Sequence, residues 1–290
     1  MLFATLSSGS SGNSYAFWNG DSAVLVDMGL SAKGLQERFD ALDLDPWMFQ
    51  DVLISHYHGD HVAAIRPWIK KHGGCIHTHA ETQEQVPYLR NNPYLVNNFE
   101  YREAFMVGSF RITPWPVIHD TPGAVTFAIE DGRHKVALIL ETGRITAEIA
   151  EDARDADALI IEANHDPGLV TQSVNEGSIP LGTGQRILQT HLRNATAARF
   201  IAEHKRAKVA VLAHLSEDRN SPELAVKAVE EALAEEFRPA DDILVLVASQ
   251  SEPSPVIDLD SFVKKPRCVS VQDMHRFANP AEEVLSLLDF

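Results

Sequence analysis

The sequence predicts a layered α/β protein in which two sheets stack face to face. Two observations carry this prediction. Short apolar runs of single-strand length alternate with amphipathic helical patterns, and the second half of the chain repeats the order of the first. The chain has 290 residues, of which 44% are hydrophobic and 23% charged, so it is long enough for a sizeable core and too apolar for disorder.

The elements of the first half are bounded by turn and cap signals. The expected strands span residues 2–6, 14–17, 23–27, 51–55 and 75–78. Ser31 is the expected N-cap of a helix that runs to about Leu42, and a second helix continues through Ile69. Between Glu81 and Tyr101 the chain is polar and rich in Asn and Pro, which predicts a helix followed by a mobile loop.

The second half repeats this alternation and then weakens. Further strands are expected at 110–118, 124–129, 136–140 and 158–162; the second half then adds strands at 209–213 and 243–248 and helices at 146–152 and 222–236. From about Glu252 proline and aspartate become more frequent and the pattern fades. We therefore expect one domain over residues 1–256 and a C-terminal tail over 257–290 with a short helix around 280–288.

Charge and cysteine content restrict the class of protein. Lys and Arg number 25 against 41 Asp and Glu, and the net charge of -16 argues against a broad basic surface for nucleic acid. Cys75 and Cys268 lie far apart with no CxxC motif, so neither a disulfide framework nor a thiolate zinc site is indicated. The N-terminus lacks a signal-peptide pattern and no long apolar run occurs, so we expect a cytoplasmic protein with no membrane contact.

The segment HYHGDH at residues 56–61 gathers metal-ligand side chains on a loop between a buried strand and a helix. His56 and His58 alternate along the chain, so both can face one ion. Asp60 and His61 follow the glycine bend and can face a second ion. The alternative, a polar loop that is rich in histidine by chance, leaves this density of ligands without a role.

With these residues in view, the chain resembles the metallo-β-lactamase superfamily, whose HxHxDH signature is matched in full. Asp27 in LVDMG resembles the family's structural aspartate, which orients the HxHxDH loop. His119 in VIHD resembles the third ligand of the first metal, and His214 in LAHLS the last ligand of the second. The resemblance implies an αββα sandwich of two mixed β-sheets flanked by helices, with a dinuclear site at its edge.

Within the superfamily the chain is most similar to the WalJ/YycJ branch over about residues 3–256. The similarity lies in the motifs SSGSSGNS, EANHD, HLRN and LAHLSEDRNSPELA. It implies a metal-dependent DNA exonuclease with two divalent ions, zinc or manganese, with iron as a further option. The implied ligands of the first metal are His56, His58 and His119; those of the second are Asp60, His61 and His214.

Two positions depart from the family pattern. Glu141 in LILETG stands where the family has a bridging aspartate. Its additional methylene adds about 1.5 Å of reach, so it either folds back to bridge or binds one ion, and we expect a weaker second metal site. Arg193 in THLRN stands where a small hydroxyl is usual, and it can clamp a phosphate or pair with one of the many carboxylates.

These features favour a two-metal phosphodiesterase in which a metal-bound hydroxide attacks phosphorus. Asp60 and His191 are the expected catalytic residues, and His191 would protonate the leaving group. The expected partner is nucleic acid, DNA rather than RNA, or a small phosphodiester. The expected substrate contacts are Ser10, Asn13, His165 and Arg193.

Two alternatives to the nuclease remain. The same metal core can hydrolyse a small ester, lactone, thioester or cyclic phosphate, because fold and metal do not fix the substrate, and the charge of -16 favours such a substrate. A non-catalytic scaffold, impaired at the second metal through Glu141, would bind metal poorly and lack phosphodiesterase activity.

Three ligand-type side chains lie outside the signature. His77 and His79 alternate on the strand IHTH, but an isolated pair is an incomplete ligand set, so we expect partly buried strand histidines. Cys75 begins the same strand and is expected as a small core residue rather than a nucleophile.

Overall fold

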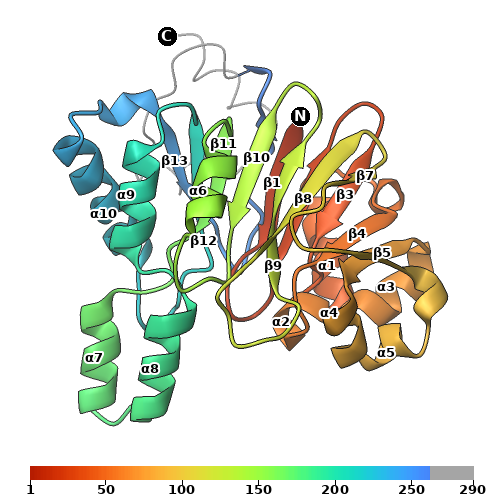
Figure 1. The fold of residues 1–290 in the computed structure, drawn as a ribbon, viewed down its shortest axis with the longest axis horizontal. Helices are drawn as coiled ribbons and strands as arrows, with labels where there is room; N and C mark the ends of the chain where they lie inside the picture. The colour runs from red at the N-terminus through yellow and green to blue at the C-terminus, as the bar shows by residue number, and fades with distance from the viewer. Residues whose placement is uncertain (262–290) are drawn as a thin grey trace.

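The computed structural model describes residues 1–261, which form two stacked β-sheets with helices on both outer faces (Figure 1). The strands of the first sheet are β1 (Leu2–Ser7), β2 (Ser14–Trp18), β3 (Ala23–Val26), β4 (Asp51–Ile54), β5 (Cys75–His79), β6 (Val96–Phe99) and β14 (Ile257–Asp258). The strands of the second sheet are β7 (Phe105–Val107), β8 (Phe110–Pro116), β9 (Val125–Glu130), β10 (Lys135–Ile139), β11 (Ala158–Glu162), β12 (Val209–Ala213) and β13 (Leu244–Val247).

The helices connect these strands. They are α1 (Ala32–Ala41), α2 (Gly59–Val62), α3 (Ile65–His72), α4 (Ala80–Gln85), α5 (Pro87–Arg90), α6 (Ala147–Ala153), α7 (Pro167–Asn175), α8 (Leu181–Thr190), α9 (Asn194–Glu203) and α10 (Pro222–Glu235). Three short 3-10 turns are η1 (Pro46–Met48), η2 (Pro93–Leu95) and η3 (Ala240–Asp242). As predicted, Ser31 caps α1, accepting a hydrogen bond from the backbone N–H of Gly34 at 3.0 Å.

Both sheets have seven strands and mixed direction. Their strand orders are β14-β1-β2-β3-β4-β5-β6 and β13-β12-β11-β10-β9-β8-β7. The parallel part of the first sheet runs from β3 to β6, and that of the second from β10 to β13. The remaining pairs are antiparallel. This is the predicted αββα sandwich of two mixed sheets flanked by helices.

Three apolar layers hold the sandwich together. The inner faces of the two sheets pack on each other around rings such as that of Phe127. On the outer face of the first sheet, α1 and α3 bury Phe39 and Trp68. On the outer face of the second, α9 and α10 bury Ile201 and Val229. Because helices cover the outer faces, both faces of the central strands are buried and these strands are almost continuously apolar.

The expectation of a mobile loop between Glu81 and Tyr101 was wrong. This segment contains α4, α5 and the strand β6, which pairs in parallel with β5. β6 is the edge strand of its sheet, and its central asparagines Asn97 and Asn98 are exposed. Polar side chains suit an edge strand because one side of its backbone has no partner strand. Composition alone therefore made β6 resemble a loop.

Helices α7 and α8 were not predicted. They form a hairpin that projects from the sandwich (Figure 1). Glycine weakens the helical pattern of this segment, yet at Gly184 it serves packing, because a Cβ atom there would lie 2.5 Å from a methyl group of Val174 on α7. The hairpin carries only two charged residues, Glu176 and Arg186.

The C-terminal end of the described chain packs onto the first sheet. Phe3 of β1 pairs with Ile257 of β14, so ordered packing continues past residue 256. The helix expected around 280–288 lies outside the described residues, and the separate tail stays a prediction. Within residues 1–261 no helix is long and apolar enough to cross a membrane.

Candidate metal centre

The candidate site lies at one edge of the sandwich, where parallel strands of both sheets end. Loops that follow the carboxyl ends of parallel strands meet at one edge, which is where α/β proteins place their ligands. The side chains that follow these strands are Asp27 after β3, His56 to His61 after β4, Glu141 after β10, Glu162 at the end of β11 and His214 after β12. His119 reaches the site from the connection between β8 and β9.

Three site residues have a left-handed backbone that is unusual for side chains other than glycine. The φ angles of Asp27, Glu141 and His214 are 60°, 54° and 53°. Each such conformation costs about 1–2 kcal/mol, so tertiary contacts must hold it. In the site this strain lies in the turns that follow β3, β10 and β12.

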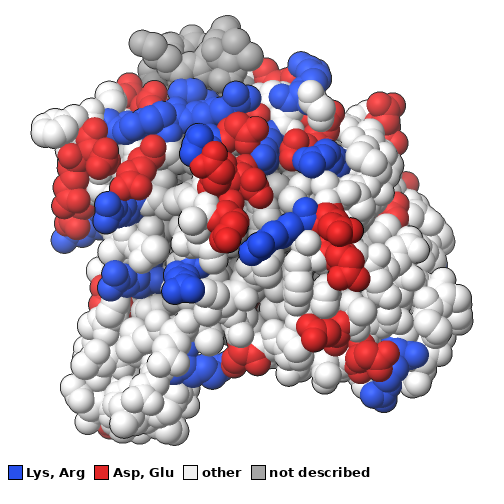
Figure 2. Space-filling model, viewed as in Figure 1, with Lys and Arg blue, Asp and Glu red and all other residues white. Residues whose placement is uncertain are grey.

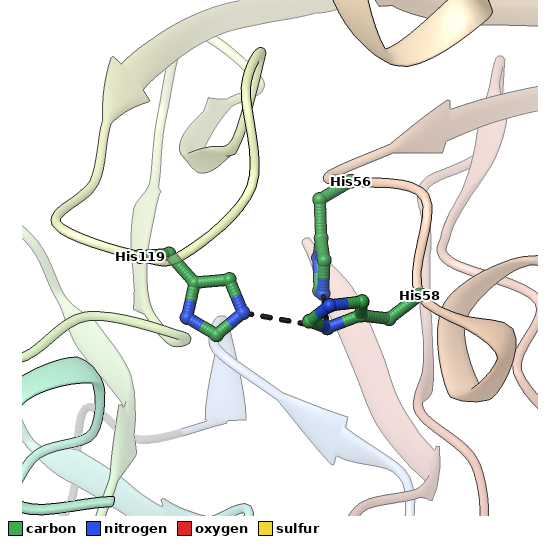
Figure 3. A group of neighbouring side chains, drawn as sticks. All are labelled: His56, His58 and His119. Carbon is green, nitrogen blue, oxygen red and sulfur yellow. Dashed lines mark hydrogen bonds between the residues drawn. The ribbon is translucent and has the colours of Figure 1, made fainter. Parts of the chain in front are cut away.

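The first cluster consists of His56, His58 and His119, whose rings converge in Figure 3. His58 Nδ1 lies 3.0 Å from His56 Nε2 and 3.4 Å from His119 Nε2. Ligands of a tetrahedral zinc ion at about 2.0–2.1 Å are separated by about 3.3 Å, so this spacing fits one ion. Burial and the neighbouring His61 lower the pKa of His56 well below its usual value and keep the ring in the neutral form that binds metal.

The second cluster consists of Asp60, His61 and His214, whose ligand atoms lie within 4.8 Å of one another. His61 Nε2 is 3.6 Å from Asp60 Oδ2. His214 Nε2 is buried without a hydrogen-bond partner. A buried polar atom with no partner is costly, and a metal ion would satisfy it.

Glu141 lies between the two clusters and is 4% exposed. Its Oε1 is 3.0 Å from His214 Nδ1 and 3.5 Å from His61 Nε2, on the side of the second cluster. Its Oε2 is 3.5 Å from His119 Nε2, on the side of the first. Burial raises the pKa of Glu141, but His214 and His191 more than offset this and leave it well below the usual value. An ionised carboxylate therefore faces both clusters.

Asp27 orients the second cluster through His61. Its Oδ2 accepts hydrogen bonds from His61 Nδ1 at 2.8 Å and from the Ser55 hydroxyl at 2.7 Å, and its Oδ1 accepts from the Ser55 backbone N–H at 2.8 Å. Burial lowers the pKa of His61, but Asp27 and Glu141 raise it to about 10. With its proton held at Nδ1, His61 presents Nε2 to the cluster.

Glu162 is a site residue that the sequence reasoning did not single out. It is fully buried, and its Oε1 lies 2.6 Å from His191 Nδ1 and 2.9 Å from His214 Nδ1. It therefore orients His214 as Asp27 orients His61. A carboxylate at the end of the apolar strand ALIIE is the signal that could have found it, because a buried acid needs a partner.

His191 and Asn13 both lie beside residues of the two clusters. Burial lowers the pKa of His191, but Glu162 and Glu141 more than offset this and the net shift is upward. Asn13 is buried, with Nδ2 3.1 Å from His61 Nε2 and 3.3 Å from Asp60 Oδ2.

The other three expected substrate residues lie in surrounding loops. Ser10 is exposed at the turn between β1 and β2. His165 is buried, which lowers its pKa to about 4, and it belongs to neither cluster. Arg193 is exposed, donates from Nε to Thr196 at 3.1 Å and makes no ion pair with any described residue.

Comparison with known proteins agrees with this fold. The chain belongs to the metallo-β-lactamase superfamily, whose family model matches residues 8–214. Proteins of this superfamily are metal-dependent hydrolases, so the family assigns the chain to that enzyme class and to divalent metal binding.

Two relatives that are similar over most of their length are named exodeoxyribonucleases. Exodeoxyribonuclease YycJ of Bacillus anthracis is 28% identical over 239 residues, which are 80% of this chain and 89% of the relative. Exodeoxyribonuclease WalJ of Streptococcus pneumoniae is 28% identical over 244 residues, which are 80% of this chain and 88% of the relative. These matches confirm the predicted similarity to the WalJ/YycJ branch.

Solved structures confirm the fold. The metallo-β-lactamase fold protein YhfI from Bacillus subtilis has a TM-score of 0.66 at 21% identity and covers 87% of this chain and 98% of its own. Zn²⁺-bound PqqB from Methylobacterium extorquens has a TM-score of 0.66 at 16% identity and covers 89% of this chain and 100% of its own.

Replacing Asp27 by Asn tests its orienting role. The amide keeps the size of the side chain but removes the charge that holds the proton on His61 Nδ1, so we expect metal affinity to fall about 10- to 100-fold. Metal content after dialysis against graded chelator measures the change. The control is Asp21→Asn in the exposed turn before β3, and equal metal retention in both variants would contradict the role.

Proposed function

We propose that this protein is a two-metal phosphodiesterase that degrades DNA as an exonuclease. The observation that carries the proposal is the position of Glu141 between two clusters of three ligand residues. Its Oε1 faces one cluster and its Oε2 faces the other. Two ions held about 3.5–4 Å apart are typical of sites that cleave phosphate esters. The exodeoxyribonuclease names of the relatives support DNA as the substrate.

The donor atoms suit two divalent cations. His56, His58 and His119 would hold one ion, and Asp60, His61 and His214 the other, with Glu141 shared between them. Imidazole and carboxylate donors favour zinc, manganese or iron. When bound, such ions polarise phosphoryl oxygens and make water acidic enough to attack phosphorus near neutral pH.

His191 and Asp60 are the proposed catalytic side chains. Burial lowers the pKa of His191, but Glu162 and Glu141 more than offset this, and the net rise favours the protonated ring. From the edge of the site, His191 can donate that proton to the leaving oxygen. Asp60 is half-buried beside His61, and its carboxylate can accept a proton from the attacking water.

Local charge makes the site accessible to DNA although the whole chain carries -16. The projecting α7–α8 hairpin ends at His191 and has almost no charged surface in Figure 2. Its single acid, Glu176, contributes little repulsion to a phosphate backbone that lies along it. Arg193 follows the hairpin, and within residues 1–261 its guanidinium forms no ion pair with a carboxylate, so it can bind a phosphate.

Labelled duplex DNA tests the proposed function. Chelator-treated full-length protein is given Mn²⁺ or Zn²⁺ and duplexes labelled at the 5′ or the 3′ end. We expect stepwise release of nucleotides from one end, absent before metal is added. No DNA cleavage, together with rapid hydrolysis of a lactone, thioester or cyclic phosphate, would assign the same centre to a small substrate. No turnover and no metal uptake would favour the scaffold.

Replacing His191 by Gln separates proton donation from metal binding. We expect metal content to stay the same and kcat on DNA to fall about 10²–10⁴-fold, because the leaving alkoxide loses its proton donor. Bis(p-nitrophenyl) phosphate should be much less affected, because its leaving group is stable without a proton. An equal loss of kcat on both substrates, or no loss of kcat on DNA, would refute this role. The control is His134→Gln, in the connection between β9 and β10.

Replacing Glu141 by Asp tests the sharing of this carboxylate. In the structure the longer side chain already reaches both clusters, so shortening it by about 1.5 Å withdraws it from one of them. We expect the number of bound metals to fall toward one and kcat to fall roughly 10- to 100-fold. If Glu141→Asp instead binds more metal, the longer side chain of glutamate weakens the second metal site, as expected from the family's aspartate at this position. The control is Glu84→Asp, an exposed position on α4.

A further inference from the structure

A second group of metal-ligand side chains lies at the other end of the first sheet. Asp51 begins β4, and Cys75 begins β5. The two residues are paired across the parallel ladder, and His77 follows Cys75 by two positions on the same strand. Side chains two apart on a strand point to the same face, so all three project from one face of the sheet. Asp51 lies at the amino end of β4, the strand whose carboxyl end leads to the HYHGDH loop of the candidate metal centre.

The donor atoms of this group are close enough for one ion. The ligand atoms of Asp51, Cys75 and His77 all lie within 4.8 Å of one another. His77 Nε2 is 2.8 Å from Asp51 Oδ1. In a tetrahedral zinc site, nitrogen and oxygen ligand atoms are separated by about 3.3 Å. To bind one ion, the Nε2 of His77 and the Oδ1 of Asp51 would therefore move apart by only about 0.5 Å.

The surroundings hold these side chains in place. Asn97 on the neighbouring strand β6 donates from Nδ2 to Cys75 Sγ at 3.1 Å, a contact that also stabilises a thiolate. The His77 ring stacks on Phe105 with ring centres 5.8 Å apart. A cavity of about 360 Å³ borders His77 and Asn97 and also contains the carboxylate of Glu103 in its lining.

The free thiol of Cys75 is not activated as a nucleophile. Burial and the nearby Asp51 raise the pKa of Cys75, so the free thiol is protonated and a weak nucleophile at neutral pH. A metal ion would displace that proton, because the thiolate is the form that coordinates metal. Asp51 and Cys75 are half-buried, so water can complete the coordination.

We propose that Asp51, Cys75 and His77 form a third metal site, which binds one zinc-class divalent cation separately from the two-ion centre. Its mixed sulfur, nitrogen and oxygen donors favour Zn²⁺ or Co²⁺ over Mn²⁺ or Mg²⁺. An ion there cross-links β4 to β5 beside the edge strand β6 and stabilises that edge, since it binds only the folded chain. The proposal does not depend on the proposed function.

Cobalt titration tests this site specifically, because the ligands proposed for the two-ion centre include no sulfur. Chelator-treated full-length protein is titrated with Co²⁺ and its near-ultraviolet absorption recorded. We expect a thiolate-to-cobalt charge-transfer band that rises to saturation as this site fills, whereas Co²⁺ taken up by the two-ion centre adds nothing to the band. The band should disappear in Cys75→Ser and remain in Cys268→Ser, the control at the only other cysteine.

A second variant keeps the test decisive if Cys75→Ser does not fold. His77→Gln retains the thiol but removes one of three protein ligands, so the Co²⁺ affinity measured by the same band should fall at least about tenfold. The proposal is overturned if the wild-type protein gives no thiolate band, if the band persists in Cys75→Ser or is lost in Cys268→Ser, or if His77→Gln binds Co²⁺ as tightly as the wild type. The pair of His77 and Asp51 would then be a hydrogen bond that only joins two strands.

Discussion

The carboxylate of Asp27 is the contact on which the geometry of the candidate metal centre depends. It accepts three hydrogen bonds from Ser55 and His61, and thereby ties the end of β3 to the loop after β4. Hydrogen bonds to a charged group are worth about 1.5–3 kcal/mol each, enough to hold the left-handed backbone of Asp27 itself. Two residues later, the backbone at Gly29 packs directly against the HYHGDH loop. A Cβ atom at Gly29 would lie 1.6 Å from the backbone oxygen of Asp60, so this position requires glycine. The sequence LVDMG therefore fixes the loop that carries the histidines.

Buried charge organises the rest of the centre. Asp27, Glu141 and Glu162 are almost fully buried, and each has a histidine as its partner. Buried carboxylates are stable only when they are neutralised, and without metal the protons of the partner rings do this. Divalent cations held by these residues would supply the same positive charge, so their uptake would release protons from the partner rings. The raised pKa of His214, which the two glutamates cause against the effect of burial, belongs to this balance.

Most of the centre was predictable because its residues follow local motifs. His56, His58, Asp60 and His61 lie within six positions, and the strand before them marks which edge they reach. The role of Glu162 was not predictable in this way, because its partner His214 lies 52 positions away. The reach of Glu141 depends on a backbone conformation that residue types do not disclose. The fold was predictable in outline. The edge strand β6, with its two asparagines, and the helices α7 and α8, in a segment that contains glycine, were missed because such sequences resemble loops.

In the proposed centre, two ions would share the carboxylate of Glu141. Anomalous X-ray diffraction from crystals of the full-length protein grown with Zn²⁺ or Mn²⁺ locates such ions. We expect two anomalous peaks about 3.5–4 Å apart, one among His56, His58 and His119 and the other among Asp60, His61 and His214, with one oxygen of Glu141 on each. A single peak, or two ions with Glu141 bound to only one of them, would rule out the shared carboxylate.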